Sequence, residues 1–187
     1  MALAIFPMAW APKRSRSLAA NFFRDVVNIG QNVGTLGGRL LVNRHSTIEE
    51  GKRLRGEMAG TFTKNLLLKD KKGRLFLLAI HEDRELDLKT LHTTVGASGR
   101  LGFASGDRMI EVLGVAPGAL TPLGIINDRN GLVTVVLDGV LIDAEQLNFH
   151  PLVNTESTGL SPGELVSFIR SCGRDPLVVD LGPTGGG

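Results

Sequence analysis

The chain has 187 residues, 42% of them hydrophobic, which suits one folded domain. Its single cysteine, Cys172, excludes an intramolecular disulfide and a cysteine-based zinc site, and fits a reducing, cytoplasmic compartment. Residues 1–46 hold six basic residues and one acidic residue, whereas residues 47–187 hold 15 basic and 18 acidic residues. The second part is slightly acidic, which argues against broad binding to nucleic-acid phosphates but leaves open contact with one end of a nucleic acid.

The first 46 residues form a basic extension that we predict to be poorly ordered. An alternative is that residues 22–29 form a short amphipathic helix and residues 40–42 a strand that covers the sheet. Two glutamates in its first turn predict a helix over residues 47–58, so we place the start of the domain at residue 47. No segment has the length and apolarity needed to span a bilayer.

Two apolar runs of strand length come next, at residues 66–68 and 75–80. Lys71-Lys72-Gly73 between them has the composition of a turn, so the two runs are predicted to form a hairpin. The second run is apolar almost throughout, which indicates a strand buried on both faces.

The next two predicted elements are helices. The first covers residues 86–95 and ends at Gly96. Ser105 caps the second, which continues to Leu113 and stops at Gly114. Both ends rest on the ability of glycine to adopt the left-handed conformation that closes a helix.

Residues 123–126 and 132–137 are apolar and are predicted as strands. Between them, Asp128-Arg129-Asn130-Gly131 contains the Asn-Gly pair that favours a tight hairpin turn. We therefore expect these two strands to be antiparallel neighbours.

The C-terminal part begins with Ser161-Pro162-Gly163-Glu164, a capping box with proline at the first helical position. It predicts a helix to residue 171 or 172, followed by a buried strand at residues 177–179 and a glycine-rich flexible tail at 182–187. The elements together predict an α+β fold, with a mixed, mainly antiparallel sheet and helices packed on it.

Motifs for covalent or metal chemistry are absent from the sequence. There is no Gly-x-Ser-x-Gly elbow, no His-Glu-x-x-His, no Walker phosphate loop and no dinucleotide fingerprint. Cys172 stands near the end of an amphipathic helix and is interpreted as inert rather than nucleophilic. We expect no metal and no cofactor, so a hydrolase of this kind would have to activate water directly or let its substrate do so.

Lys64-Asn65 stands at the entry to the first clear strand. An arbitrary Lys-Asn pair at a strand start is usually just solvated. Here a rigid strand follows it, and side chains on strand ends are well positioned for chemistry. Lys64 offers a fixed positive charge and three donors to a phosphate, ribose or ester oxygen, and Asn65 can add an amide donor.

Two further candidates lie downstream. Gly118-Ala119-Leu120-Thr121-Pro122 is a loop in which glycine lets backbone N–H groups approach a ligand and proline adds stiffness. The Thr121 hydroxyl could equally bond to the loop's own backbone. His150, placed where a strand would begin, can orient an amino group or a water as a neutral imidazole; His45, His81 and His92 are interpreted as structural.

These residues resemble a known family. Residues 63–73, 114–128 and 149–155 are collinear with the YbaK/prolyl-tRNA synthetase-associated editing domains, and most similar to the free-standing Ala-tRNA(Pro) deacylases of the ProXp-ala or PrdX group. The resemblance extends from Thr47 to Leu181. It implies that Lys64, the Gly-x-x-x-Pro loop and His150 are functional.

The resemblance also implies a reaction and partners. Water would cleave the ester between alanine and the terminal ribose of proline tRNA, with help from the free ribose hydroxyl. The expected partner is the acceptor end of that tRNA, with prolyl-tRNA synthetase as a second candidate. Two alternatives stay open: a Cys-tRNA(Pro) deacylase, and a non-catalytic module that binds an RNA end or a synthetase.

Overall fold

The computed structural model of the chain describes residues 40–41, 59–152 and 156–182. Within them, eight strands form one mixed sheet in the order β1-β7-β6-β2-β3-β5-β8, with β4 paired to β2. Four of the seven pairings are antiparallel and three are parallel. The strands are β1 (Leu40–Leu41), β2 (Thr61–Lys69), β3 (Leu75–His81), β4 (Gly102–Phe103), β5 (Val133–Asp138), β6 (Leu147–Phe149), β7 (Glu156–Leu160) and β8 (Leu177–Val179).

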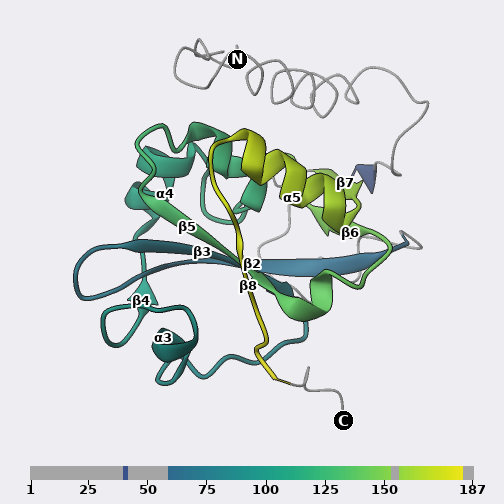
Figure 1. Cartoon of the computed structure of the whole chain (residues 1–187). Helices are drawn as coiled ribbons and strands as arrows, with labels where there is room; N and C mark the ends of the chain where they lie inside the picture. The colour runs from purple at the N-terminus through teal and green to yellow at the C-terminus, as the bar shows by residue number, and fades with distance from the viewer. Residues whose placement is uncertain (1–39, 42–58, 153–155, 183–187) are drawn as a thin grey trace.

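Helices cover both faces of the sheet (Figure 1). One face carries α4 (Gly106–Leu113), the 3-10 helix η1 (Pro122–Asn127) and α5 (Pro162–Ser171), and both α4 and α5 pack against η1. The other carries α3 (Leu91–Thr94), while the 3-10 turn η2 (Gly139–Leu141) follows β5. The predicted α+β class with a mixed sheet is confirmed.

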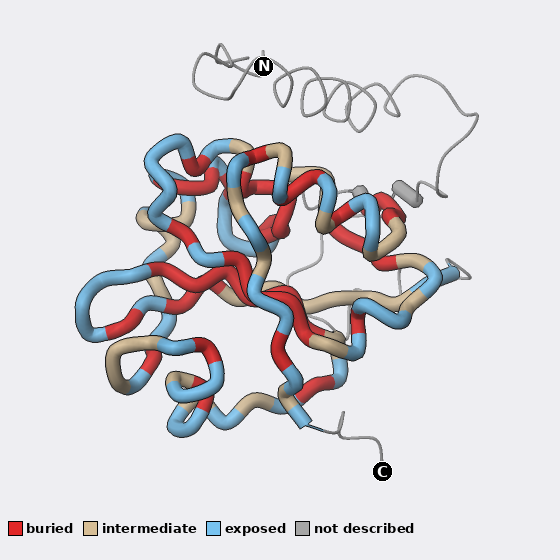
Figure 2. Tube along the Cα trace, viewed as in Figure 1, coloured by how far each residue is buried: buried red, intermediate tan, exposed pale blue. Residues whose placement is uncertain are grey.

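The middle strand β3 is buried on both faces, as its apolar run predicts. Leu75, Leu77 and Ala79 belong to the core cluster beneath α4 and α5, whereas Phe76 and Leu78 belong to the cluster on the α3 side. Figure 2 shows this band of buried chain through the centre of the molecule. The predicted β2–β3 hairpin is also confirmed, although β2 already starts at residue 61.

The local helix signals are confirmed where they are strongest. The Ser105 side chain accepts a hydrogen bond from the Arg108 backbone N–H, and Gly114 ends α4 in the left-handed conformation, with φ 66°. At α5 the Ser161–Glu164 capping box is complete. Such caps depend on residues within one turn of each other, which is why they can be read from the sequence.

The predicted helix over residues 86–95 is wrong in its first half, because only Leu91–Thr94 is helical. The Asp87 carboxylate accepts hydrogen bonds from the Lys89 N–H and the Thr90 hydroxyl. This side-chain-to-backbone turn competes with helix formation, as is common for aspartate.

The predicted strand at residues 123–126 and its hairpin are also wrong. Residues Pro122–Asn127 form η1, whose N-cap is Thr121, and β5 instead pairs in parallel with β3 and β8. An apolar run of this length does not distinguish a strand from a buried helical turn. Asp128 explains the lost hairpin, because its carboxylate accepts hydrogen bonds from the N–H groups of Leu132 and Val133 and holds the turn beside β5.

The two ends of the sheet differ from the expectation. Strand β8 is present, but Leu177 and Val178 are exposed, because β8 is an edge strand. At the other end Leu40–Leu41 forms β1 and pairs with β7, so the strand considered as an alternative for residues 40–42 is present at these two residues. The predicted helix at 47–58, the rest of the basic extension and residues 183–187 lie outside the described residues, and the boundary near residue 46 stays a prediction.

Candidate functional site

Strand β2 places Lys64 and Asn65 in its interior rather than at its entry, which corrects the sequence interpretation. Lys64 is in register with Ile80, and Asn65 with Ala79. Because side chains alternate along a strand, the two residues point to opposite faces of the sheet. Asn65 shares its face with the core beneath α4 and α5, and Lys64 shares its face with Ile80 on the α3 side.

A hydrogen bond joins Asn65 to the Gly118–Pro122 loop. The Asn65 Nδ2 donates to the Leu120 carbonyl oxygen at 3.0 Å, across 55 residues of sequence. A carbonyl can only accept, so this bond fixes the amide orientation and leaves Oδ1 as an acceptor. Oδ1 is buried and accepts no hydrogen bond from the part of the chain that the structure describes. Asn65 therefore acts first as the anchor of the loop.

The loop presents backbone rather than side chains. Gly118 is exposed and has φ 87°, a conformation that favours glycine. Ala119, Leu120, Thr121 and Pro122 are buried, and the Thr121 hydroxyl accepts a hydrogen bond from the Leu123 N–H at 3.3 Å. Thr121 is thus the cap of η1, and a ligand could meet this loop at the exposed backbone around Gly118.

One edge of β2 is interrupted at this point. On the side away from β3, β6 pairs with residues 61–62 and β4 with residues 68–69, and no described strand pairs with the stretch between them. The Ala104 N–H donates to the Leu67 carbonyl on this side, at 2.9 Å. Backbone groups alternate like side chains, so the N–H and C=O of Asn65 point into the same gap. The Gly118 loop and β2 therefore meet at a break in the sheet.

His150 comes directly after β6, not at the start of a strand as predicted. Phe62 and Asn148 are the last register pair between β2 and β6, and Lys64 and His150 each follow that pair by two residues. His150 is half-buried. Two residues later Leu152 has φ 66°, a strained value for leucine that costs about 1–3 kcal/mol and often accompanies functional sites.

Cys172 is a poor nucleophile in this fold. It is buried, and burial raises the pKa of its thiol to about 11, so the thiolate is scarce at neutral pH. Among residues 40–41, 59–152 and 156–182, no three His, Cys, Asp or Glu side chains cluster as they would around a metal ion. The same residues contain no helix that could span a membrane.

The chain is similar to one known protein family and to several named proteins. The family model described as aminoacyl-tRNA editing domain matches residues 43–168. A mouse protein named prolyl-tRNA synthetase associated domain-containing protein 1 is 36% identical over 158 residues, covering 81% of this chain and 93% of its own. The prolyl-tRNA editing protein ProX of Acetoanaerobium sticklandii is 35% identical over 136 residues, covering 72% of this chain and 82% of its own.

The fold also has a solved counterpart. A crystal structure described as that of a candidate trans-editing enzyme for prolyl tRNA synthetase superposes with a TM-score of 0.60 at 19% identity. The superposition covers 91% of this chain and 99% of the other. At this level of identity the match supports the fold alone.

Proposed function

Because the chain belongs to the aminoacyl-tRNA editing domain family, we propose that it hydrolyses the ester bond between a wrongly attached amino acid and the terminal ribose of a tRNA. The observation that carries this proposal is the hydrogen bond from Asn65 to Leu120. It fixes a glycine-containing loop beside an interrupted strand edge, next to the strand that bears Lys64. The exposed backbone at Gly118 suits an ester that develops negative charge, and a cation on the adjoining strand suits the terminal nucleotide of an RNA chain.

We infer that the tRNA is proline tRNA and the amino acid alanine. The names of the mouse and Acetoanaerobium relatives support the link to prolyl-tRNA. Such an editing reaction is needed for a physical reason. Each methylene missing from a substrate changes its binding free energy by only about 1–3 kcal/mol. A synthetase site built for proline therefore rejects alanine weakly, and a second, smaller site removes the error. Cysteine is the alternative amino acid.

The proposed reaction needs no nucleophile from the protein. The oxygen of a water attacks the ester carbonyl carbon, the bond from that carbon to the ribose 3′ oxygen breaks, and the ribose oxygen takes up a proton as it leaves. The neighbouring 2′ hydroxyl assists by orienting the water and relaying a proton: it accepts one from the attacking water as it passes its own to the departing 3′ oxygen. The backbone N–H of Gly118 stabilises the developing oxyanion, Lys64 holds the terminal nucleotide from the other face of β2 at the interrupted edge, and His150 orients the amino group or the water.

A panel of charged tRNAs tests the function. Alanyl-, cysteinyl- and prolyl-tRNA(Pro) are incubated with the protein, and the fraction still esterified is followed over time. We expect rapid loss of the alanyl ester and persistence of the prolyl ester, with and without a metal chelator. Faster loss of the cysteinyl ester would assign the alternative specificity, and stability of all three esters would leave a binding module as the function.

The ribose assistance has its own test. An alanyl-tRNA(Pro) that ends in 2′-deoxyadenosine keeps the ester but lacks the assisting hydroxyl. We expect its hydrolysis to fall by a large factor while its affinity changes little. Equal rates on both substrates would remove the substrate hydroxyl from the mechanism.

A further inference from the structure

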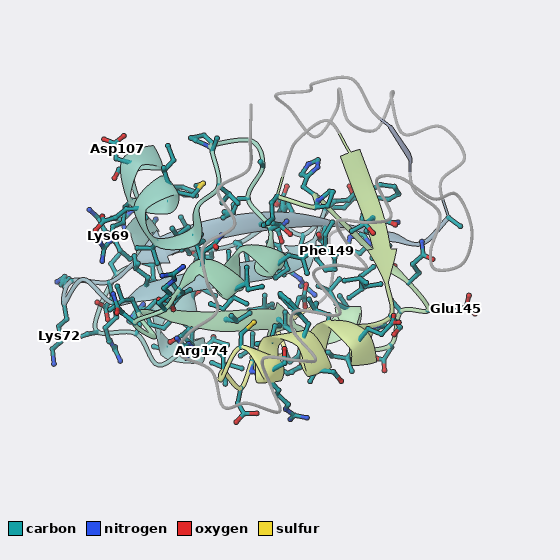
Figure 3. All side chains as sticks on the ribbon, turned by 90° about the horizontal axis from the view of Figure 1, so that it is seen from above. Lys69, Lys72, Asp107, Glu145, Phe149 and Arg174 are labelled. Carbon is teal, nitrogen blue, oxygen red and sulfur yellow. The ribbon has the colours of Figure 1, made fainter. Side chains whose placement is uncertain are left out.

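Three lysines gather at the hairpin end of β2 and β3. Lys69, Lys71 and Lys72 are all exposed and are here called the hairpin patch. Figure 3 shows Lys69 and Lys72 reaching outward at one end of the molecule, with Asp107 of α4 on the same side and Phe149 further along. Among the described residues none of the three lysines forms an ion pair with an acid.

The acid next to these lysines in sequence, Asp70, does not neutralise the patch, because it is used inside the turn. Asp70 is buried, and its carboxylate accepts hydrogen bonds from the backbone N–H groups of Lys72, Arg74 and Ser98. It also pairs with the Arg74 guanidinium at 2.7 Å. The turn is therefore rigid, and its lysine charges face solvent on a fixed frame.

Lys71 is held in place by packing as well. A Cβ built on Gly99 would lie 3.2 Å from the Lys71 Cδ and 3.3 Å from its Cε, so the lysine stem lies beside Gly99. Phe103, on the neighbouring strand β4, is 61% exposed and is in register with Leu68. Fixed cations with an exposed aromatic ring nearby are typical of surfaces that bind nucleic acid.

The distance between the hairpin patch and the candidate site can be spanned by a few nucleotides. Lys69 follows Lys64 by five residues on one continuous strand, which corresponds to roughly 17 Å at about 3.3 Å per residue. A tRNA end bound beside Lys64 would cover this distance with a few unpaired nucleotides before its duplex begins. The phosphates at the start of the acceptor stem would then lie near the hairpin.

We propose that the hairpin patch binds phosphates of the tRNA acceptor stem while the terminal nucleotide occupies the site beside Lys64; this rests on the proposed function. The charge distribution supports a local contact. Residues 47–187 hold more acids than bases, yet three cations with no ion pair to a described acid are concentrated at one turn. Such a patch adds affinity for the RNA without taking part in the chemistry, and makes that affinity dependent on salt.

The test combines two substrates with a matched pair of variants. The variant Lys69→Ala/Lys71→Ala/Lys72→Ala removes the patch. The control Lys89→Ala/Arg129→Ala/Arg170→Ala removes the same charge from exposed positions outside it. Affinity is measured with an uncharged acceptor-stem minihelix of proline tRNA at several salt concentrations, and hydrolysis is measured on 3′-alanyl-adenosine, which has no stem.

We expect the patch variant to bind the minihelix at least tenfold more weakly at 0.1 M salt and to flatten the slope of log affinity against log salt by about 2 to 3. Its hydrolysis of alanyl-adenosine should equal that of the wild type, and the control should behave as wild type in both assays. Unchanged minihelix affinity would overturn the proposal and point to an acidic protein as the partner of the patch. An equal loss on alanyl-adenosine would also overturn it, by placing these lysines in the site.

The two proposals fail separately. A wild-type protein that binds the minihelix through the patch but hydrolyses no ester would refute the proposed function and leave the RNA contact standing. A wild-type protein that hydrolyses the ester but binds the minihelix without the patch would refute the RNA contact and leave the proposed function standing.

Discussion

Asn65 links the two halves of the candidate site through a single side chain. Its amide nitrogen holds the Leu120 carbonyl, while its amide oxygen stays buried without a described donor. A buried acceptor without a donor costs free energy, which makes it a natural position for a donor that arrives with a ligand. A change at Asn65 should therefore affect both β2 and the Gly118–Pro122 loop.

Replacing Asn65 by alanine should therefore release the loop. We expect the free energy of unfolding to fall by about 1 kcal/mol, the usual net value of one hydrogen bond, and kcat/KM for deacylation to fall with it. Asn127→Ala is the matched control, because the Asn127 Nδ2 also donates to a backbone carbonyl, that of Leu113, at 2.8 Å. Equal activity in the two alanine variants would show that the Asn65 bond serves stability alone.

The sequence supports part of this residue-level account. It singles out Lys64, Asn65 and the Gly118 loop, because charged and amide side chains beside strands and glycine loops suggest chemistry. It does not show that Asn65 contacts Leu120, since no local pattern reports a contact between residues so far apart in the chain. It also starts the strand too late, which hides the fact that Lys64 and Asn65 point to opposite faces.

Among the elements, the Gly118 loop depends on one backbone conformation. Valine at this position would meet two obstacles, a φ of 87° that costs about 1–2 kcal/mol for an L-residue and a branched side chain over the exposed backbone. Gly96→Val provides the control for strain, because Gly96 has φ 66° and open space around its Cβ position. We expect both variants to lose similar stability and only Gly118→Val to lose most deacylation, measured by thermal unfolding and initial rates.

The hairpin turn should respond to acid through Asp70. Burial raises the pKa of this carboxyl, but hydrogen bonds from Ser98, Arg74 and Lys72 lower it more, from 3.8 to about 2. The folded state thus binds this proton more weakly than the unfolded state, so the stabilisation is complete above pH 4 and is lost as the pH falls towards 2.

Asp70→Asn should remove that dependence. We expect the difference in melting temperature between wild type and variant to be largest at pH 5 and to shrink steadily down to pH 2. Melting curves followed by circular dichroism at several pH values measure it. A difference that stays constant over this range would mean that the Asp70 charge does not stabilise the turn.

Element prediction succeeds where the controlling residues are close together. Ser105, Ser161 and Glu164 act within one helical turn, and their caps are present as predicted. Residues 123–126 fail because their apolar pattern suits a strand as well as the 3-10 helix that forms.

For the whole molecule, a buried ion pair ties the C-terminal segment to the sheet. The Arg84 guanidinium is fully buried and pairs with Asp138 at the end of β5. It also donates to the carbonyl oxygens of Leu181 and Gly182, at 3.1 and 2.6 Å. The parallel β3–β5 pairing that brings these groups together is not apparent in the sequence, where the Asn-Gly turn favours a hairpin instead.

Breaking the ion pair between Arg84 and Asp138 should destabilise the folded protein. Arg84→Met leaves the buried Asp138 charge without its cation, for which we expect a loss of about 3–5 kcal/mol in unfolding free energy, measured with urea. The double variant Arg84→Met/Asp138→Asn should lose less, because it removes the charge as well. If the double variant is as unstable as the single one, the lost packing of Arg84 and not the stranded charge explains the effect.

The most direct test of the whole account is the single-turnover rate of alanyl-tRNA(Pro) hydrolysis by the wild type and by Lys64→Ala. Lys64 is the one cation that we place at the terminal nucleotide, and removal of one such preorganised donor typically slows a reaction by about 10²–10³-fold. We predict rapid hydrolysis by the wild type and a loss of that size in the variant, with an unchanged melting temperature. Hydrolysis by folded Lys64→Ala at the wild-type rate would contradict the account.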